Sequence, residues 1–276
     1  MDMARMSTSQ SPLTGKTIAI TRPAEQADGV VERLRALGAN PVSTPTIAIV
    51  PPEDFQRLDA AIGNLSAYDW LLLTSVNGVR VFRERLDALG MDPARLANLK
   101  VGAIGPATAG TLEAGGIRVT FVPTSYRAES ILAEIGRVEG QRMLLPRAEL
   151  ARPLLASGLR DLGAEVDEIP AYRTVPGPGI AELAKLLRAN RVDAITFTSS
   201  STVRFFHQEL LQTGETPQTI AAMLASPVMT VCIGPVTAAT ARELGLRVDV
   251  VAEAYTIDGL VAALAAFTNW PESPRK

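Results

Sequence analysis

The fold is decided by a stretch that the chain carries twice: KTIAITRP at residues 16–23 and QRMLLPR at residues 141–147. Each copy is a short apolar run that ends in an arginine, which is typical of a strand buried on both faces and followed by a polar turn. A helical pattern follows each copy and ends alike, as LRALGA at residues 34–39 and LRDLGA at residues 159–164. These matched segments indicate an internal repeat.

Two more pairs of segments occur in the same order. DWLLLTS at residues 69–75 is echoed by DAITFTS at 193–199, and IGPATA at residues 104–109 by IGPVTA at 233–238. After the last pair each copy continues with a helix, a glycine, a short strand and a tyrosine before another helix; the tyrosines are Tyr126 and Tyr255. Matched blocks in one order predict a duplicated unit.

Each half alternates short apolar runs with helical stretches, which predicts an α/β fold with right-handed strand–helix–strand crossovers. The near-continuous apolar runs at residues 70–73 and 194–197 predict strands of a parallel sheet with helices on both faces. Gly38 and Gly163 stand where a helix ends in a residue with positive φ. We therefore expect two flavodoxin-like, doubly wound lobes.

Two segments at matching repeat positions have the composition of crossings between the lobes. Residues 40–50 and 165–175 are extended in pattern and interrupted by prolines, among them Pro45 and Pro170. Simple tandem lobes remain the alternative. If the chain crosses here, the two segments could pair as a two-stranded β ladder that joins the lobes.

The composition is that of an ordinary globular protein: 276 residues, 47% hydrophobic, 20% charged and a net charge of -2. No strong field favours nucleic acid or an acidic membrane, and no apolar run reaches the roughly 18 residues of a membrane span. Residues 1–12 lack the apolar core of a signal peptide and are expected to form a flexible arm, while residues 269–276 are expected to fray. The single cysteine, Cys232, cannot form an internal disulfide. These features favour a cytoplasmic protein.

Hydroxyl groups gather where the repeated strands end. Thr74 and Ser75 follow one strand, and Thr198, Ser199 and Ser200 follow its echo. Such residues cap helices, and the free backbone N–H groups beside them bind anions. Capping and ligand binding both stay open, because the two roles can coexist.

The turns at Gly105–Thr108 and Gly234–Thr237 repeat this strand–turn–helix pattern, so Thr108 and Thr237 are further candidates at the carboxyl ends of the strands, where open parallel sheets bind ligands. Arg22 and Arg147 end the first strand of each repeat. Each could hold a carboxylate in bidentate fashion or form a surface ion pair.

The chain lacks the residues that several other kinds of site require. The chain has one histidine, His207, and one cysteine, so neither a nucleophile–base triad nor a zinc site of the usual type is expected. His207 itself is expected on a helix surface or partly buried. No Walker loop occurs and no GxGxxG follows a strand, so we expect no nucleotide cofactor and no metal.

The ordered set of motifs resembles uroporphyrinogen-III synthases. The matching pieces are ITRP at 20–23, TS at 74–75, IGPAT at 104–108, LPR at 145–147, PAYRT at 170–174, FTS at 197–199 and IGPVT at 233–237. The resemblance extends from Lys16 to Phe267. It implies two flavodoxin-like lobes joined by a β ladder, with lobe 1 formed by residues 1–43 and 174–276 and lobe 2 by residues 44–173.

The resemblance also implies an activity. Such enzymes act as monomers without a cofactor and close hydroxymethylbilane in a cleft between the lobes, as cyclising hydro-lyases of tetrapyrrole (heme) biosynthesis. Loss of the hydroxymethyl oxygen leaves a cationic azafulvene, which the far pyrrole attacks through its substituted α-carbon. The resulting spiro intermediate fragments and closes again with that ring inverted. Tyr172 matches the functional tyrosine of the family, and Thr108 and Thr237 match its rim threonines. A phenol at Tyr172 could assist hydroxyl departure as a general acid or only position the substrate; the alternative is a tyrosine that packs against the edge of the ladder.

Three alternatives remain. One is a non-catalytic tetrapyrrole or small-anion sensor on the same scaffold, which an attached DNA-binding or receiver segment would favour. Another is a two-lobed receptor for a small anion, which an export signal would favour. The third is a different α/β enzyme, for which the nucleophile–base sets are missing.

Overall fold

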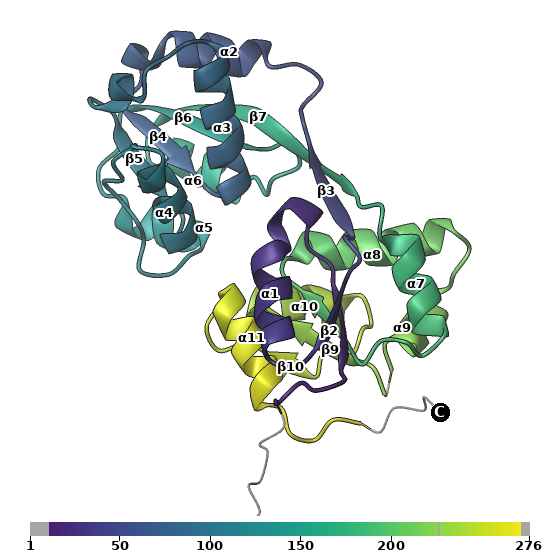
Figure 1. The fold of residues 1–276 in the computed structure, drawn as a ribbon. Helices are drawn as coiled ribbons and strands as arrows, with labels where there is room; N and C mark the ends of the chain where they lie inside the picture. The colour runs from purple at the N-terminus through teal and green to yellow at the C-terminus, as the bar shows by residue number, and fades with distance from the viewer. Residues whose placement is uncertain (1–10, 226, 272–276) are drawn as a thin grey trace, which may run out of the picture. The chain divides into compact units, whose positions relative to one another are not determined.

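The computed structural model describes residues 11–225 and 227–271. The chain divides into two compact units (Figure 1): unit 1 contains residues 1–48 and 175–276, and unit 2 contains residues 49–174. Most of the expected arm at residues 1–12 and most of the chain end at 269–276 lie outside the described residues. Trp270 is described, and its ring meets that of Phe267 edge to face at a centroid distance of 6.0 Å, so the expectation of fraying is wrong at this residue.

Unit 1 is built on a parallel sheet. The strands follow one another in the order β10-β9-β8-β1-β2, and all neighbouring pairs in this order are parallel. The elements are β1 (Thr17–Ile20), η1 (Ala24–Gln26), α1 (Asp28–Ala36), β2 (Asn40–Ser43), α7 (Ile180–Arg188), β8 (Ala194–Phe197), α8 (Ser200–Gln212), α9 (Pro217–Met223), β9 (Met229–Cys232), α10 (Pro235–Glu243), β10 (Val250–Val251) and α11 (Ile257–Ala266).

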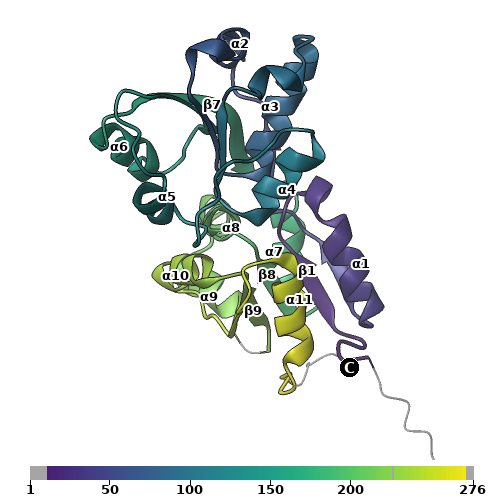
Figure 2. The ribbon, with the colours of Figure 1, turned by 90° about the vertical axis from the view of Figure 1, so that its left-hand side faces the viewer.

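Helices cover both faces of this sheet, as Figure 2 shows. Alternate strand residues point to opposite faces, so Ile18 and Ile20 pack with α1 and α11 while Ala19 packs with α7 to α10. β8 is buried at every position, which confirms the strand expected at residues 194–197. Burial on both faces is the reason for its largely apolar sequence, in which the buried Thr196 hydroxyl donates to the Ala19 carbonyl.

Unit 2 repeats this layering. Its sheet has the order β3-β7-β6-β4-β5, and the β7–β6, β6–β4 and β4–β5 pairs are parallel. The elements are α2 (Gln56–Gly63), η2 (Leu65–Ala67), β4 (Trp70–Leu73), α3 (Val76–Ala88), η3 (Pro93–Leu96), β5 (Lys100–Ala103), α4 (Pro106–Ala114), α5 (Ala128–Glu134), β6 (Arg142–Ala148), α6 (Leu154–Asp161) and β7 (Glu165–Pro176), with β3 (Ile47–Val50) at the unit boundary.

The strand residues of unit 2 also alternate between two cores. Leu71 and Leu73 pack with α2, α3 and α4, whereas Trp70 and Leu72 pack with α5 and α6. A parallel bridge between Gly102 and Phe121 extends the sheet beyond β5. The α/β class with parallel sheets and helices on both faces is therefore confirmed.

The first expected crossing segment is extended and contains two strands. β2 pairs with β1, and only β3 is a neighbour of β7. The break falls at Thr44–Thr46, where the N–H groups of Thr44 and Thr46 donate to the carbonyls of Ile20 and Thr21 while Pro45 has no N–H to offer a ladder. The expected pairing of the two crossing segments is confirmed for β3 and β7.

The helix endings of the repeat have the expected backbone. Gly38 and Gly163 have φ values of 84° and 86°, a conformation that favours glycine, so this prediction is confirmed. Across residues 11–225 and 227–271, no helix combines the length and the apolar character required to cross a membrane.

Candidate functional site

The candidate residues lie at the carboxyl-terminal ends of the strands in each unit. We call these two sets the unit 2 rim and the unit 1 rim. In unit 2, Thr74 and Ser75 follow β4, Thr108 lies in the first turn of α4 after β5, Arg147 is near the end of β6, and Tyr172 is in β7. Parallel strands place these ends along one edge of the sheet.

A hydrogen bond joins two of the candidates on the unit 2 rim. The Ser75 Oγ and Tyr172 hydroxyl oxygens are 2.9 Å apart. Ser75 is also the N-cap of α3, where its Oγ accepts the N–H of Gly78 at 2.9 Å. Ser75 thus caps a helix and contacts the tyrosine at the same time.

Tyr172 is the more buried member of this pair, with 7% of its surface exposed. Burial raises the pKa of its phenol above the ordinary value of 10.0, because the charged form loses hydration; the hydrogen bond from Ser75 and the positive charge of Arg147 oppose part of that rise. The phenol is therefore protonated at neutral pH and can act as a hydrogen-bond donor.

The structure places Arg147 differently from a free carboxylate-binding group. It is buried, its Nη1 is 3.0 Å from Glu168 Oε1, and its Nη2 donates to the Arg152 carbonyl at 2.7 Å. Burial lowers its pKa, and the charge of Glu168 opposes that shift. Its buried Nε has no hydrogen-bond partner among the described residues. Arg147 thus anchors the loop after β6 and contributes positive charge near Tyr172.

Thr108 stands at the start of α4, a helix whose N-cap is Gly105 and which begins with a proline. Without a capping side chain, the N–H groups of Ala107 and Thr108 are left for a ligand or water. The side chain of Thr108 is 4% exposed, and within residues 11–225 and 227–271 its hydroxyl forms no hydrogen bond. This turn has the composition of an anion site.

The unit 1 rim repeats the turn but uses its hydroxyls differently. Ser199 caps α8, where its Oγ accepts the Thr202 N–H at 3.2 Å, and the Ser200 hydroxyl lies 2.8 Å from that of Thr240. Thr198, in the turn before them, is partly exposed. The capping alternative is therefore confirmed for Ser199, and a binding role for these three residues stays a prediction.

Thr237 and Arg22 complete the unit 1 rim. Thr237 stands in the first turn of α10 as Thr108 does in α4, is 5% exposed and has no hydrogen bond from its hydroxyl in the described part of the chain. Arg22 follows β1; its Nη2 donates to Gln26 Oε1 at 3.1 Å, and its buried Nε has no hydrogen-bond partner among the described residues. Burial lowers the pKa of Arg22.

Sequence reasoning missed the partners of these residues. Nothing in the repeat pointed to the Ser75–Tyr172 bond, to Glu168 as the partner of Arg147, or to Thr240 as the partner of Ser200. Glu168 was weakly indicated as a partner of Arg147, because it lies in the strand next to that of Arg147. His207, expected on a helix surface or partly buried, is buried in α8. Burial lowers its pKa.

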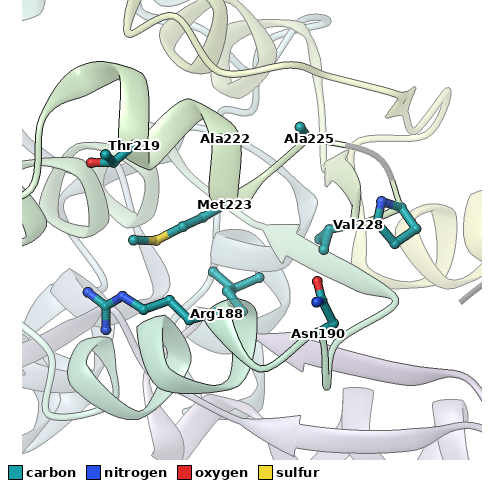
Figure 3. A pocket seen from close by; sticks show the side chains of 9 residues that line it. Arg188, Asn190, Thr219, Ala222, Met223, Ala225 and Val228 are labelled. Carbon is teal, nitrogen blue, oxygen red and sulfur yellow. The ribbon is translucent and has the colours of Figure 1, made fainter. Parts of the chain in front are cut away.

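A separate pocket of about 260 Å³ lies in unit 1 (Figure 3). Its lining comes from the end of α7, from α9 and from the residues just before β9, so it is at the amino-terminal ends of the strands and not on the rim. Among the described lining residues, the charged side chain is that of Arg188, which is already paired with Glu215. The other lining residues are uncharged, as Met223 and Val228 are. The rims are therefore the better candidate site.

Comparisons with known proteins all point to one family. The family model described as uroporphyrinogen-III synthase HemD matches residues 28–262. The uroporphyrinogen-III synthase of Synechococcus elongatus is 37% identical over 258 residues, which is 92% of this chain and 96% of that protein. The porphyrin biosynthesis protein HemD of Ruminiclostridium josui is 35% identical over 92% of this chain, which spans 49% of that longer protein.

A solved structure has the same architecture. The crystal structure of a mutant uroporphyrinogen III synthase from the extremely thermophilic bacterium Thermus thermophilus aligns with a TM-score of 0.67 and 26% identity, and covers 90% of this chain and 96% of that one. The family match extends over most of the sequence, from α1 to α11. The chain therefore belongs to the uroporphyrinogen-III synthase HemD family.

Proposed function

We propose that this protein cyclises hydroxymethylbilane to uroporphyrinogen III, with inversion of the terminal pyrrole ring and loss of water, in tetrapyrrole biosynthesis. The observation that carries the proposal is the extent of the family match, residues 28–262, together with a relative named uroporphyrinogen-III synthase that aligns over 96% of its length. The reaction is a dehydration with formation of a carbon–carbon bond, so its balance requires proton transfers but no oxidant or reductant.

We infer that the two units are the two domains of this enzyme and that each is a flavodoxin-like copy of one ancestor. Numbered along unit 1, the strand order β2-β1-β8-β9-β10 is 2-1-3-4-5, the flavodoxin order. In unit 2 the order β7-β6-β4-β5, followed by the bridge at Phe121, is the same series once β6 is aligned with β1. The sequence repeat makes that alignment. The contact units at residues 48/49 and 174/175 support domain boundaries close to there.

Tyr172 is proposed as the general acid. The Gly78 N–H donates to Ser75 Oγ, so the Ser75 proton is free to point at the Tyr172 oxygen. The phenol proton is then available to the leaving hydroxymethyl oxygen, which departs as water when the carbon–oxygen bond breaks. Arg147 stabilises the phenolate that this transfer creates, and ring re-aromatisation at the end of the reaction returns a proton to it.

The rim threonines and their helix N-termini are proposed to bind the substrate's carboxylates. Thr108 and Thr237 each offer a hydroxyl beside free backbone N–H groups at the positive end of a helix dipole. Thr74, Thr198, Ser199 and Ser200 line the neighbouring turns. Arg22, with exposed surface and an unpartnered Nε, is proposed to hold a carboxylate, whereas Arg147 acts near Tyr172.

We also propose that the enzyme needs no cofactor and acts as a monomer in the cytoplasm. The dehydration can be carried by groups of this chain, since a phenol, hydroxyls and backbone N–H groups suffice for the proton transfers and for binding. A single buried cysteine is compatible with a reducing compartment. Light scattering of the purified protein would measure the oligomeric state directly, and a mass of two chains would contradict this part.

A genetic experiment tests the function. The gene is expressed in a bacterial strain that lacks its own uroporphyrinogen-III synthase and therefore requires heme. We expect growth without added heme. Accumulation of the folded protein without growth would contradict the proposal, and the empty vector provides the control.

A further inference from the structure

Both rims carry a half-exposed tyrosine at the same place in the repeat. Tyr126 follows the bridge residue Phe121 in unit 2, and Tyr255 follows β10 in unit 1. Their exposed fractions are 49% and 57%, which are high values for large aromatic residues of a globular protein. Neither ring is needed for a core, so each has a face available for another molecule.

Each tyrosine ring packs closely against a glycine. A Cβ built on Gly105 would lie 3.0 Å from Cγ of Tyr126, and one built on Gly234 would lie 3.1 Å from Cδ1 of Tyr255. The φ values of these glycines are -172° and -175°, which any residue adopts. The close approach of the tyrosine ring, and not the backbone conformation, therefore favours glycine here.

The glycine against which each ring packs is also the N-cap of the helix that carries the rim threonine. Gly105 precedes α4 and Gly234 precedes α10, so each tyrosine ring packs at the start of the helix that carries Thr108 or Thr237. Thr108 and Thr237 are more than nine-tenths buried, yet their hydroxyls have been left without a protein partner. These hydroxyl oxygens are not themselves sealed from solvent, so they can bond to a ligand or to water.

We propose that Tyr126 and Tyr255 are substrate-binding residues, each forming the aromatic wall of a subsite for one carboxylate-bearing pyrrole ring. This rests on the function proposed above. The pyrrole stacks on the exposed face of the tyrosine, and its acidic side chain reaches the helix N-terminus and the threonine hydroxyl. The repeat supplies one such subsite in each unit.

The test begins with single variants at each tyrosine. In Tyr126→Ala and Tyr255→Ala we expect the KM for hydroxymethylbilane to rise by about 2- to 12-fold, since a lost aromatic contact typically weakens binding by that factor. Tyr126→Leu should behave like the alanine variant, and Tyr126→Phe should raise the KM less than about threefold because it keeps the ring. The rates are measured as initial formation of isomer III.

Two control variants change partly exposed apolar side chains that lie away from the rims. Leu89 ends α3 in unit 2 and Leu211 is in the last turn of α8 in unit 1, and both are partly exposed apolar side chains. Leu89→Ala and Leu211→Ala should leave the KM unchanged. Gly105→Ala provides a further test, because its Cβ pushes the Tyr126 ring outward by a few tenths of an ångström while the ring remains; we expect a smaller rise in KM with an unchanged melting temperature.

Alanine variants with the wild-type KM would overturn the proposal, as would a rise of equal size in the leucine controls. Failure of the proposed function is recognised separately, because the wild-type protein would then form only isomer I. In that case the subsites are tested with porphobilinogen, a stable monopyrrole with two acidic side chains, by saturation-transfer NMR. Saturation transfer that the Tyr126→Ala and Tyr255→Ala variants together abolish would support the subsites, and transfer that survives in the double variant would refute them.

Discussion

Replacement of Tyr172 by phenylalanine is the sharpest test of the proposed general acid. The change removes one hydroxyl and with it the 2.9 Å hydrogen bond to Ser75, while the ring stays in its buried place. Loss of one such bond costs about 1 kcal/mol of stability, or a few degrees in melting temperature. A general acid contributes about 10²- to 10⁴-fold to a rate. Because hydroxymethylbilane loses its hydroxyl readily, we expect the lower end, about 100-fold in kcat, with little change in KM.

The assay follows isomer III formation over a range of pH. Burial keeps the Tyr172 pKa above its ordinary value, so the acid form persists through neutral pH and the wild-type rate should decline only in strongly alkaline solution. That alkaline decline should disappear in Tyr172→Phe.

Tyr68→Phe is the matched control for Tyr172→Phe. This variant also loses a phenol hydrogen bond, the 2.7 Å bond from Tyr68 to Asp167. Tyr68, however, lies just before β4, at the other end of the same sheet. Its kcat should equal that of the wild type. A wild-type kcat and isomer ratio in Tyr172→Phe would refute the general-acid role, and an equal loss in Tyr68→Phe would assign the effect to stability.

Three further predictions concern the rest of the molecule. Burial lowers the pKa of His207, so the unfolded chain takes up a proton more readily than the native protein below about pH 6.5; the free energy of unfolding in urea should fall as the pH drops through that value, and His207→Gln should reduce the fall. An unchanged pH dependence in His207→Gln would contradict this. The Cys232 thiol is fully buried and its pKa is raised to about 12, so Ellman's reagent should label it only after denaturation, and rapid labelling of the native protein would show that it is accessible. Gly177→Ala should lower the free energy of unfolding by about 1–3 kcal/mol, because the new Cβ would lie 2.3 Å from the Pro45 carbonyl oxygen. Gly29→Ala, in α1 with open space around it, should instead be neutral or stabilise by up to about 1 kcal/mol, and equal effects in the two variants would count against the packing argument.

The parts of the fold that local sequence determines could be predicted. The near-continuous apolar runs at residues 70–73 and 194–197 are strands because burial on both faces favours apolar side chains, and the one polar residue among them, Thr196, bonds to the Ala19 carbonyl. Gly38 and Gly163 were predictable because a helix that ends in positive φ favours glycine. Both features depend only on near neighbours in the chain.

The division of residues 40–50 into β2 and β3 was not predictable in the same way. Both pieces are extended and differ only in which strand they pair with, and that choice depends on β1 and β7, which are distant in the sequence. The prolines showed that the ladder is interrupted but not that the chain changes sheets.

The contact between Ser75 and Tyr172 was hidden for a related reason. The register of β6 and β7 shifts between Arg147 and Ala148, so that Ala148 lies opposite Tyr172 and not opposite Ala171. Such a bulge redirects the side chains that follow it. Pro170, which has no N–H, comes just before the shift, but its presence alone does not reveal which residue is displaced. The rim residues could thus be predicted from the ends of the strands. The hydrogen bond between Ser75 and Tyr172 could not be predicted without the register of β6 and β7.

The most direct test of the account is the identity of the product. The purified protein is given freshly generated hydroxymethylbilane, and the porphyrins formed after oxidation are separated by chromatography into isomers I and III. We predict that isomer III predominates, since only catalysed closure inverts the terminal ring. Isomer I alone, at the rate of the reaction without protein, would contradict the proposed function.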